Sequence, residues 1–360
     1  MNYGLTGLFT GFLLACLPSA GSAQSDSLIV PGEDHFTAIR QLTFSGENAE
    51  AYLDAANERL IFQSANDSTP CDQIFIMNLD GSGLKKVSKG GGKTTCSYFI
   101  PGTNTILYSS TRSAGSDCPP PPDFRKGYVW PIYPSFDIYL ADENGNDIRP
   151  LTTTPGYDAE ATVSVDGKTI VFTSMRDGDL DIYTMKSDGS DVKRLTSELG
   201  YDGGPFFSHD GTRIIYRAYH PQTEQEKSDY RQLLSENIIR PMNFEIWIMN
   251  ADGTGKKKLT NTGMASFAPF FSPDDQWVIF SSNMADPVKK RNFDLFMVRA
   301  DGSGEIRRIT FSPGFDGFPM FTRDGKKLIF SSNRNNGGGN STNVFVADWT
   351  WTPLTKGTKP

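Results

Sequence analysis

The chain has 360 residues, 37% of them hydrophobic, and its mean hydropathy is −0.40, values typical of a soluble globular protein. Its net charge of −7 and isoelectric point near 5.1 argue against nucleic acid or an anionic membrane surface as a partner. One amphipathic segment, 224–239, is typical of a helix, and most of the remainder has the alternating pattern of β-strands.

The first residues are typical of an export signal. Residues 8–17 form an apolar run too short to span a bilayer, and a Gly-Ser-Ala sequence offers a cleavage site before Gln24. No Lys or Arg precedes the run, and the Leu-Leu-Ala-Cys sequence ending at Cys16 also resembles a lipoprotein box. We therefore expect a periplasmic or secreted protein with a signal peptide at 1–23 and a linker at 24–38. The alternatives are an outer-membrane lipoprotein anchored at Cys16 and a retained hydrophobic start.

A phrase of about 44 residues recurs along the chain and is cleanest between Leu151 and Thr196. Its anchor pair, Leu-Thr or a close variant, begins at Leu42, Val87, Leu151, Leu195, Leu259, Ile309 and Leu354. Each unit resolves into four short runs rich in β-branched and aromatic residues, joined by Asp-Gly turns such as the one at Asp166. Four antiparallel strands repeated at this period predict the blade of an all-β propeller.

The number of blades follows from the first strand of each unit. These strands are expected at 49–53, 95–100, 159–163, 204–207, 268–271 and 318–321, which predicts six blades. The last unit has only three strands and ends at 343–348, so its fourth strand must come from elsewhere. We expect 39–43 to close the ring as the outer strand of the last blade, because it has the sequence of a fourth strand and precedes any first strand. Closure by the tail around Leu354 is the alternative; the propeller would span 39–349, followed by a tail at 350–360.

Long insertions gather on one face of the predicted propeller. Second-to-third and fourth-to-first links share a face, here called the top face, and the tight Asp-Gly turns occupy the bottom face. The longest links, 113–135 and 219–243, and two shorter ones, 283–292 and 333–342, are all second-to-third links. Because loops that lengthen on one face commonly carry function, they are candidate partner-binding segments. The residues that we expect to contact a partner are Phe124, Tyr128, Trp130, Tyr133, Tyr230 and Leu233.

The loops that lead into the first strands repeat a Gly-aromatic-Asp sequence and should line the mouth of the central channel. The candidate binding residues there are Glu50, Asp158, Glu160, Asp202 and Asp316, with Arg112, Arg176, Arg217 and Arg334 at the ends of second strands. An acidic mouth ringed by arginines could hold calcium or a cationic ligand, and no other cofactor is expected. The alternative is structural: each Asp caps its turn, and an Arg bridges it to the next blade.

Three cysteines follow the export signal: Cys71, Cys96 and Cys118. We expect all three on the top face of adjacent blades, where an oxidising compartment would form one disulfide and leave one thiol. We favour Cys71–Cys96 or Cys96–Cys118. Zinc is the alternative, but the three histidines lack metal-type spacing, so no metal site is assigned.

The sequence contains no Gly-x-Ser-x-Gly elbow, no His-Glu-x-x-His and no phosphate loop. No catalytic residue is therefore assigned, and we expect a binding protein rather than an enzyme. The alternative is a carbohydrate-binding or carbohydrate-active propeller with an acidic channel. It would need carboxylates near Asp158, Asp202 and Asp316 about 5–10 Å apart around an open pocket.

The repeat resembles the TolB-type, WD-like propeller repeats of bacterial envelope proteins. The resemblance rests on Ser-x-Asp-Gly-x-x-Ile-x-Phe-x-Ser-x-Arg at 164–176 and Asp-Ile-Tyr-x-Met-x-x-Asp-Gly-Ser at 181–190, and it covers nearly all of 40–348. It implies a propeller scaffold of the bacterial envelope. From the top-face insertions we expect a monomer that binds an envelope protein or peptide. The family's namesake has a separate α/β domain before its propeller. At most 15 residues lie between Gln24 and Ile39, so we expect a propeller without that domain.

Overall fold

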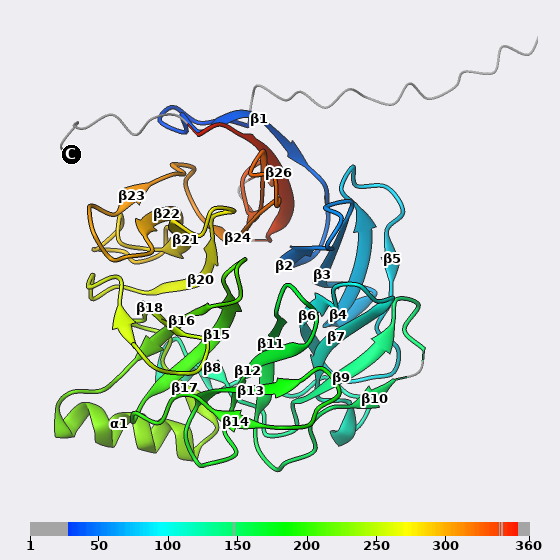
Figure 1. Cartoon of the computed structure of the whole chain (residues 1–360), viewed down its shortest axis with the longest axis vertical. Coiled ribbons are helices and arrows are strands. Elements are labelled where there is room, and N and C mark those ends of the chain that lie inside the picture. The colour runs from blue at the N-terminus through cyan, green and yellow to red at the C-terminus, as the bar shows by residue number, and fades with distance from the viewer. Residues whose placement is uncertain (1–27, 147, 338, 340, 352–360) are drawn as a thin grey trace, which may run out of the picture.

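A computed structural model describes residues 28–146, 148–337, 339 and 341–351. These residues form six four-stranded antiparallel sheets arranged in a ring around a central channel (Figure 1). The prediction of an all-β, six-bladed propeller is therefore confirmed. The predicted signal peptide, Cys16 and the tail around Leu354 lie outside the described residues.

The strands of each blade follow one another from the channel to the outer edge. Blades one to three are β2 (Glu47–Leu53), β3 (Arg59–Asn66), β4 (Thr69–Asn78) and β5 (Lys85–Lys86); β6 (Thr94–Phe99), β7 (Thr105–Ser110), β9 (Asp137–Asp142) and β10 (Arg149–Pro150); β11 (Asp158–Val163), β12 (Thr169–Ser174), β13 (Asp181–Lys186) and β14 (Lys193–Arg194). Blades four to six are β15 (Tyr201–Phe207), β16 (Arg213–Tyr219), β18 (Glu245–Asn250) and β19 (Lys257–Lys258); β20 (Ser266–Phe271), β21 (Trp277–Ser282), β22 (Asp294–Arg299) and β23 (Arg307–Arg308); β24 (Asp316–Phe321), β25 (Lys327–Ser332), β26 (Asn343–Trp349) and β1 (Phe36–Gln41).

The ring closes through the first strand of the chain, as predicted. Strand β1 pairs antiparallel with β26, with Ile39 opposite Ala347 and Gln41 opposite Phe345. The pairing continues beyond β1, where the Leu42 amide donates to the Val344 carbonyl at 2.8 Å. In Figure 1 the first strand lies along the outer side of the last one. Closure gives β26 a partner and removes the edge that an open blade would leave.

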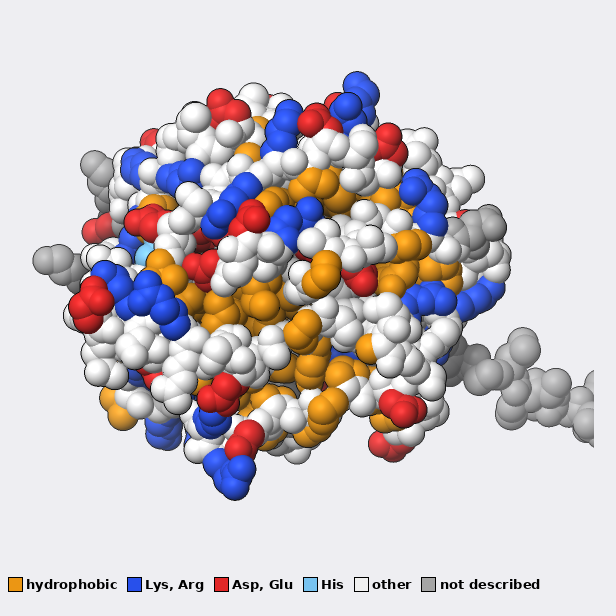
Figure 2. Space-filling view, turned by 90° about the horizontal axis from the view of Figure 1, so that it is seen from below, with side chains coloured by type: hydrophobic (Ala, Val, Ile, Leu, Met, Phe, Trp, Pro, Cys, Tyr) orange, Lys and Arg blue, Asp and Glu red, His pale blue; other side chains and the backbone are white. Residues whose placement is uncertain are grey.

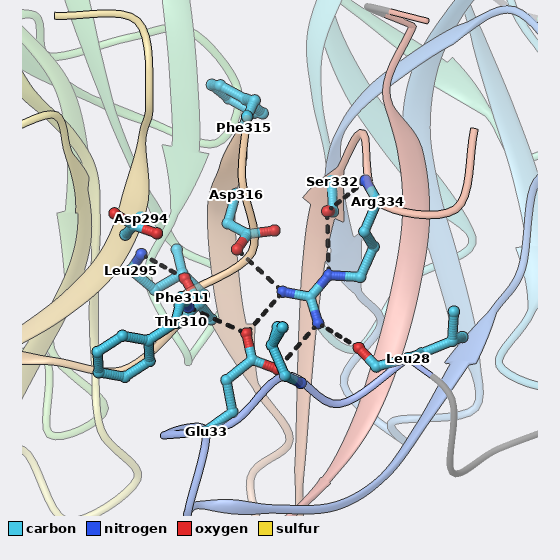
Figure 3. A network of polar contacts seen from close by, with 12 residues as sticks. Leu28, Glu33, Asp294, Leu295, Thr310, Phe311, Phe315, Asp316, Ser332 and Arg334 are labelled. Atoms are coloured by element: carbon cyan, nitrogen blue, oxygen red, sulfur yellow. Dashed lines mark hydrogen bonds and ion pairs between the residues drawn. The ribbon is translucent and has the colours of Figure 1, made fainter. Parts of the chain in front are cut away.

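A buried ion-pair network fixes the segment before β1 to the sixth blade (Figure 3). The guanidinium of Arg334, just after β25, pairs with Glu33 at 3.0 Å and with Asp316 at 2.9 Å. All three side chains are at most 4% exposed. Arg334 also donates to the Leu28 carbonyl at 3.0 Å, and the Phe311 amide donates to Glu33 at 3.1 Å. One cation thus holds two carboxylates that the sequence separates by almost 300 residues.

The bottom-face turns have the predicted Asp-Gly chemistry. In the turn between β13 and β14, Gly189 has a φ of +90°, and the Ser190 amide donates to the Asp188 carboxylate at 2.9 Å. A left-handed backbone of this kind suits glycine, which has no Cβ. These short turns leave the bottom face plain, so the elaborations lie on the top face.

Removal of the Arg334 side chain should destabilise the closed ring strongly. Arg334→Ala leaves Glu33 and Asp316 buried without a cation, and we expect the free energy of unfolding to fall by about 3–5 kcal/mol. Arg125→Ala is the matched control, because Arg125 is 90% exposed in its ion pair with Asp123, and its loss should leave the stability essentially unchanged. Urea unfolding of both variants measures the difference. Similar losses of stability in the two variants would contradict a stabilising role for the buried ion-pair network.

Candidate functional site

A ring of left-handed residues occupies the middle of the channel. Each inner strand has one residue with φ between 49° and 59°, at the point where its pairing with the second strand shifts register. The six residues are Glu50, Cys96, Glu160, Gly204, Ala268 and Phe318. Repeated bulges of this kind redirect side chains. All six line a cavity of about 30 Å³, here called the channel cavity.

Glu160 is the most heavily bonded acidic group of the channel cavity. It forms an ion pair with Arg217 and accepts from the Tyr201 hydroxyl at 2.9 Å and from the Thr173 hydroxyl at 2.8 Å. The Gly204 amide donates to the same carboxylate at 2.9 Å. These partners come from the neighbouring blades three and four, so Glu160 joins the two blades at the channel.

Gly204 is required at its position by the approach of Arg217. A Cβ on Gly204 would overlap the Arg217 guanidinium, and the backbone φ of +59° is in addition strained for any residue with a side chain. The other five left-handed positions carry side chains that line the channel cavity. The bare glycine therefore lets Arg217 reach Glu160.

Glu50 is the second carboxylate of the channel cavity. Burial raises its pKa from 4.5 to about 7, and the nearby charge of Glu160 adds to this rise, while Arg217 and a hydrogen bond with the Cys96 thiol oppose it. Burial also raises the pKa of the Cys96 thiol, which is consequently protonated at neutral pH. The channel cavity thus contains one carboxylate that gains or loses a proton near neutral pH.

Aromatic side chains close the channel below the cavity. Tyr52 packs against Tyr98 and Phe206, with ring centroids 5.7 and 5.3 Å apart, and Phe206 packs against Phe270 at 5.5 Å. Phe206 lines both the channel cavity and a separate cavity of about 50 Å³ at the bottom face. A space of 30 Å³ is enough for only one or two water molecules, so the channel cavity has no room for a sugar ring.

The three aspartates predicted at the channel mouth lie inside their own blades instead. Each is at most 1% exposed. Their partners are Arg176 for Asp158 at 3.1 Å, His220 for Asp202 at 2.9 Å and Arg334 for Asp316 at 2.9 Å. This arrangement is closer to the structural alternative, in which an arginine pairs with each aspartate, than to an acidic binding mouth. The pairs form within one blade, however, and not between neighbouring blades. Arg112 has no aspartate at this position and stacks on Tyr139, 5.5 Å from the ring centroid.

Arg217 differs in strand position from Arg112, Arg176 and Arg334, which the sequence analysis placed with it at the ends of second strands. Arg176 lies two residues beyond Ser174, the partner of Asp158, and His220 holds the same place relative to Asp202. Arg217 lies earlier on its strand and points into the channel cavity. The pKa of His220 is raised: burial lowers it, but the hydrogen bond with Asp202 and the charge of that carboxylate outweigh the burial.

The disulfide joins Cys71 to Cys118, whose Cα atoms are 5.6 Å apart, and Cys96 is the free thiol. Both favoured pairings were wrong because Cys96 occupies the left-handed position of its inner strand and faces the channel cavity. Cys71 and Cys118 lie in the region of the second-to-third links of blades one and two, and their bond joins these blades.

The insertions of blades two and four combine into one structure, here called the platform. It comprises η1 (Arg112–Ala114), η2 (Phe124–Lys126), β8 (Trp130–Pro131), α1 (Glu224–Ser235) and β17 (Ile238–Ile239). Strands β8 and β17 pair antiparallel, Lys126 forms an ion pair with Glu236, and Arg240 donates to the Lys126 carbonyl at 3.0 Å. The sequence predicted the helix but not this pairing, which spans blade three.

The six predicted partner residues divide into two groups. Phe124 and Tyr128 are 60% and 64% exposed. Tyr230 and Leu233 are 5% and 6% exposed, so the prediction that they meet a partner does not fit the structure. They lie on the apolar face of α1, where Leu233 packs with Val129 of the other insertion. The two remaining residues are half-buried: Trp130 packs on Phe244 at 5.8 Å, and Tyr133 donates to the Pro120 carbonyl at 2.6 Å.

Comparisons with known proteins agree with this architecture. A family model described as the TolB β-propeller domain matches residues 134–239. The chain forms a β-propeller that is similar to that of TolB. The structure of a putative TolB from Agrobacterium tumefaciens superposes with a TM-score of 0.57 at 20% identity, over 85% of this chain and 91% of that one, a likeness of fold.

Sequence relatives match shorter segments. The Tol-Pal system protein TolB of Bordetella pertussis is 49% identical over 43 residues, which are 12% of this chain and 10% of that protein. An uncharacterised protein of Agrobacterium fabrum is 33% identical over 94 residues, which are 26% of this chain and 30% of that protein. The chain thus spans less than a third of the length of either curated relative.

Two further observations concern the described residues only. They contain no group of three or more His, Cys, Asp or Glu side chains placed to hold a metal ion, so the calcium hypothesis finds no ligand set there. None of their helices combines the length and hydropathy needed to cross a bilayer.

The Glu50 carboxylate should make stability depend on pH in a defined direction. Because its pKa is higher in the folded protein, the folded state binds the proton more tightly between about pH 4.5 and 7, and stability falls as the pH rises through this window. Glu50→Gln removes this loss. Relative to wild type, the variant should gain up to about 3 kcal/mol between pH 5 and pH 8. Thermal unfolding at both pH values, with Glu47→Gln as an exposed control on the same strand, tests this, and a constant difference would count against it.

Gly204→Ala should lower stability more than an alanine substitution at another left-handed glycine that has free space around it. Gly211 has a φ of +71° and no neighbouring atom within 4 Å of an added Cβ. Gly211→Ala should therefore cost only the left-handed strain, roughly 1–2 kcal/mol, whereas Gly204→Ala should cost a further 1–3 kcal/mol from displacing Arg217. Equal losses in urea unfolding would show that Arg217 does not need the glycine.

Proposed function

We propose that this chain is a periplasmic or secreted propeller that binds an envelope protein or peptide through the platform. One observation carries the proposal: insertions from two non-adjacent blades are joined into a single, internally packed surface. A likeness to a Tol-Pal system protein over 43 residues supports the envelope location. A lipid anchor at Cys16 is the alternative route to that location.

Hydrogen bonding and packing within the platform hold the exposed Tyr128 in place. The Trp130 indole donates to the Tyr128 hydroxyl at 3.1 Å, and Trp130 itself packs against Phe244 and Phe267 of blades four and five. Val129, between these two aromatics, is 2% exposed. Anchors that are ordered before binding lose less conformational entropy on association, so such residues suit a binding surface better than a loose loop does.

Other large apolar side chains are exposed on the same face. Phe44, Met242 and Val288 lie in top-face links and are 75%, 39% and 89% exposed. Hydrophobic side chains also gather in a band on the side of the ring shown in Figure 2, between groups of charged side chains. Exposed apolar surface rimmed by polar groups is typical of protein-binding sites. The channel cavity, in contrast, offers no space for a carbohydrate, so the carbohydrate alternative gains no support there.

Substitution of the exposed platform aromatics should weaken partner binding without unfolding the protein. We expect Phe124→Ser with Tyr128→Ser to lower affinity for a protein recovered from the native envelope by about 10- to 100-fold, as expected when interface anchors are removed. The control is Leu84→Ser with Val192→Ser, which removes side chains 59% and 41% exposed on the bottom face.

The measurement is titration of the recovered protein against each purified variant. Binding that survives the platform substitutions but is lost with the bottom-face pair would contradict the proposal. A photo-reactive residue placed at position 128 should also form an adduct with the same protein, whereas one at position 84 should not.

A further inference from the structure

A further cavity adjoins blade four outside the channel, and neither Phe124 nor Tyr128 lines it. It measures about 320 Å³, which is within the size range of small-molecule sites. Side chains from the ends of β16 and β18, from β19 and from the links on both sides of the blade line it. We call it the rim pocket; the side chains that matter below are Glu198, His220, Gln222, Trp247, Lys258 and Asn261.

The rim pocket lies where blade four differs from blade three. In blade three, Arg176 pairs with Asp158 at 3.1 Å and Arg194 pairs with Asp181 at 2.6 Å. The residue equivalent to Arg176 in blade four is His220, two positions beyond the partner of the first aspartate.

The second arginine of blade three is replaced as well. Arg194 lies opposite Tyr183, and Lys258 lies opposite Trp247 in the same register. Blade five keeps an arginine at this register, Arg308, which pairs with Asp294 at 2.8 Å. Two wide guanidinium groups are thus replaced by smaller groups in blade four, and space opens at its rim.

The rim pocket contains charged groups of both signs. Glu245 is already satisfied, because it accepts from Thr260 at 2.5 Å, from the Thr262 amide at 2.7 Å and from the Gly263 amide at 2.8 Å. Lys258 donates to the Asn261 amide oxygen at 2.8 Å rather than to a carboxylate. Glu198, whose side chain is 67% exposed, lies 3.4 Å from Nδ1 of His220. A mixture of donors and acceptors, with charges of both signs, favours a neutral ligand rich in hydroxyl groups over an ion of one sign.

Trp247 supplies an apolar surface beside these polar groups. It is half-buried, lines the pocket and packs at its side against His220, with ring centroids 5.2 Å apart. In blade three the equivalent Tyr183 is covered by the Arg176 guanidinium, 5.1 Å from its ring centroid, and its hydroxyl donates to Asp177 at 2.5 Å. Trp247 has no arginine over it, and an indole has no hydroxyl to engage. A flat aromatic face among amides and a carboxylate matches the apolar C–H face and polar rim of a pyranose ring.

We propose that the rim pocket binds one neutral hexopyranose unit of a glycan, with the sugar ring stacked on Trp247. The hydroxyl groups of the sugar donate to Glu198 and accept from Lys258 and from the Gln222 amide. The rim pocket shares His220 and Gln222 with the blade-four insertion, but the exposed aromatics Phe124 and Tyr128 do not line it. A protein on those aromatics and a glycan in the pocket can therefore be held at once.

Saturation-transfer NMR of the full chain with methyl β-glucopyranoside, methyl β-galactopyranoside and N-acetylglucosamine tests the proposal. At least one sugar should give a saturable signal in the millimolar range, and sorbitol, which has hydroxyl groups but no ring, should give none. Glu198→Gln, an exposed position that does not threaten folding, should weaken binding about tenfold, because it removes a charged acceptor. Trp247→Ala should abolish binding, and Trp277→Ala, in blade five, should leave it unchanged.

The absence of a saturable signal for all three sugars would overturn the proposal, as would wild-type affinity in the Glu198→Gln variant. Circular dichroism and thermal unfolding establish whether Trp247→Ala is folded. If it is not, the Glu198→Gln result decides. Binding of a protein to the platform is measured separately, so neither result depends on the other.

Discussion

Closure of the ring is the constraint on which every other feature depends. Each blade buries its faces against two neighbours, and the sixth blade is complete only when β1 pairs with β26. Arg334 strengthens this closure because it neutralises Glu33 and Asp316 together in a site with almost no solvent access. Pairing of strands from the two ends of the described chain holds the circle of blades at a fixed size, and with it the channel and the top face.

Positions at which one blade differs from the others indicate where the propeller is specialised. Five of the six left-handed inner positions carry a side chain, and the sixth is a glycine where Arg217 enters to reach Glu160. Blade four also contains the helix, the His220–Asp202 pair and the rim pocket. The insertion of blade four also pairs with that of blade two through β17 and β8.

Much of the fold could be predicted because the repeat is local. The Asp-Gly turns and four-strand units predicted six blades, and the missing fourth strand predicted closure by 39–43, which β1 confirms. The buried Asp–Arg pairs were harder to place, because the direction of a side chain depends on strand register. Arg217 and His220 are three residues apart, yet one faces the channel and the other its own blade.

Contacts between segments that are distant along the chain could not be predicted from the sequence. The spacing of the cysteines could not show that a bulge turns Cys96 into the channel, which leaves Cys71 to pair with Cys118. Pairing of β8 with β17 joins segments about 110 residues apart and follows from no repeat, so the burial of Leu233 against Val129 was also missed. An amphipathic helix predicts that one face is buried, but not by which segment.

The central claim is that the joined insertions form the binding surface. Hydrogen–deuterium exchange of the protein, alone and with the envelope protein that it retains, tests this most directly. The account predicts that binding slows exchange in 124–132 and 237–244 and leaves the bottom-face turns at 80–86 and 188–194 unchanged. Protection confined to those bottom-face turns, with none in either insertion, would contradict it.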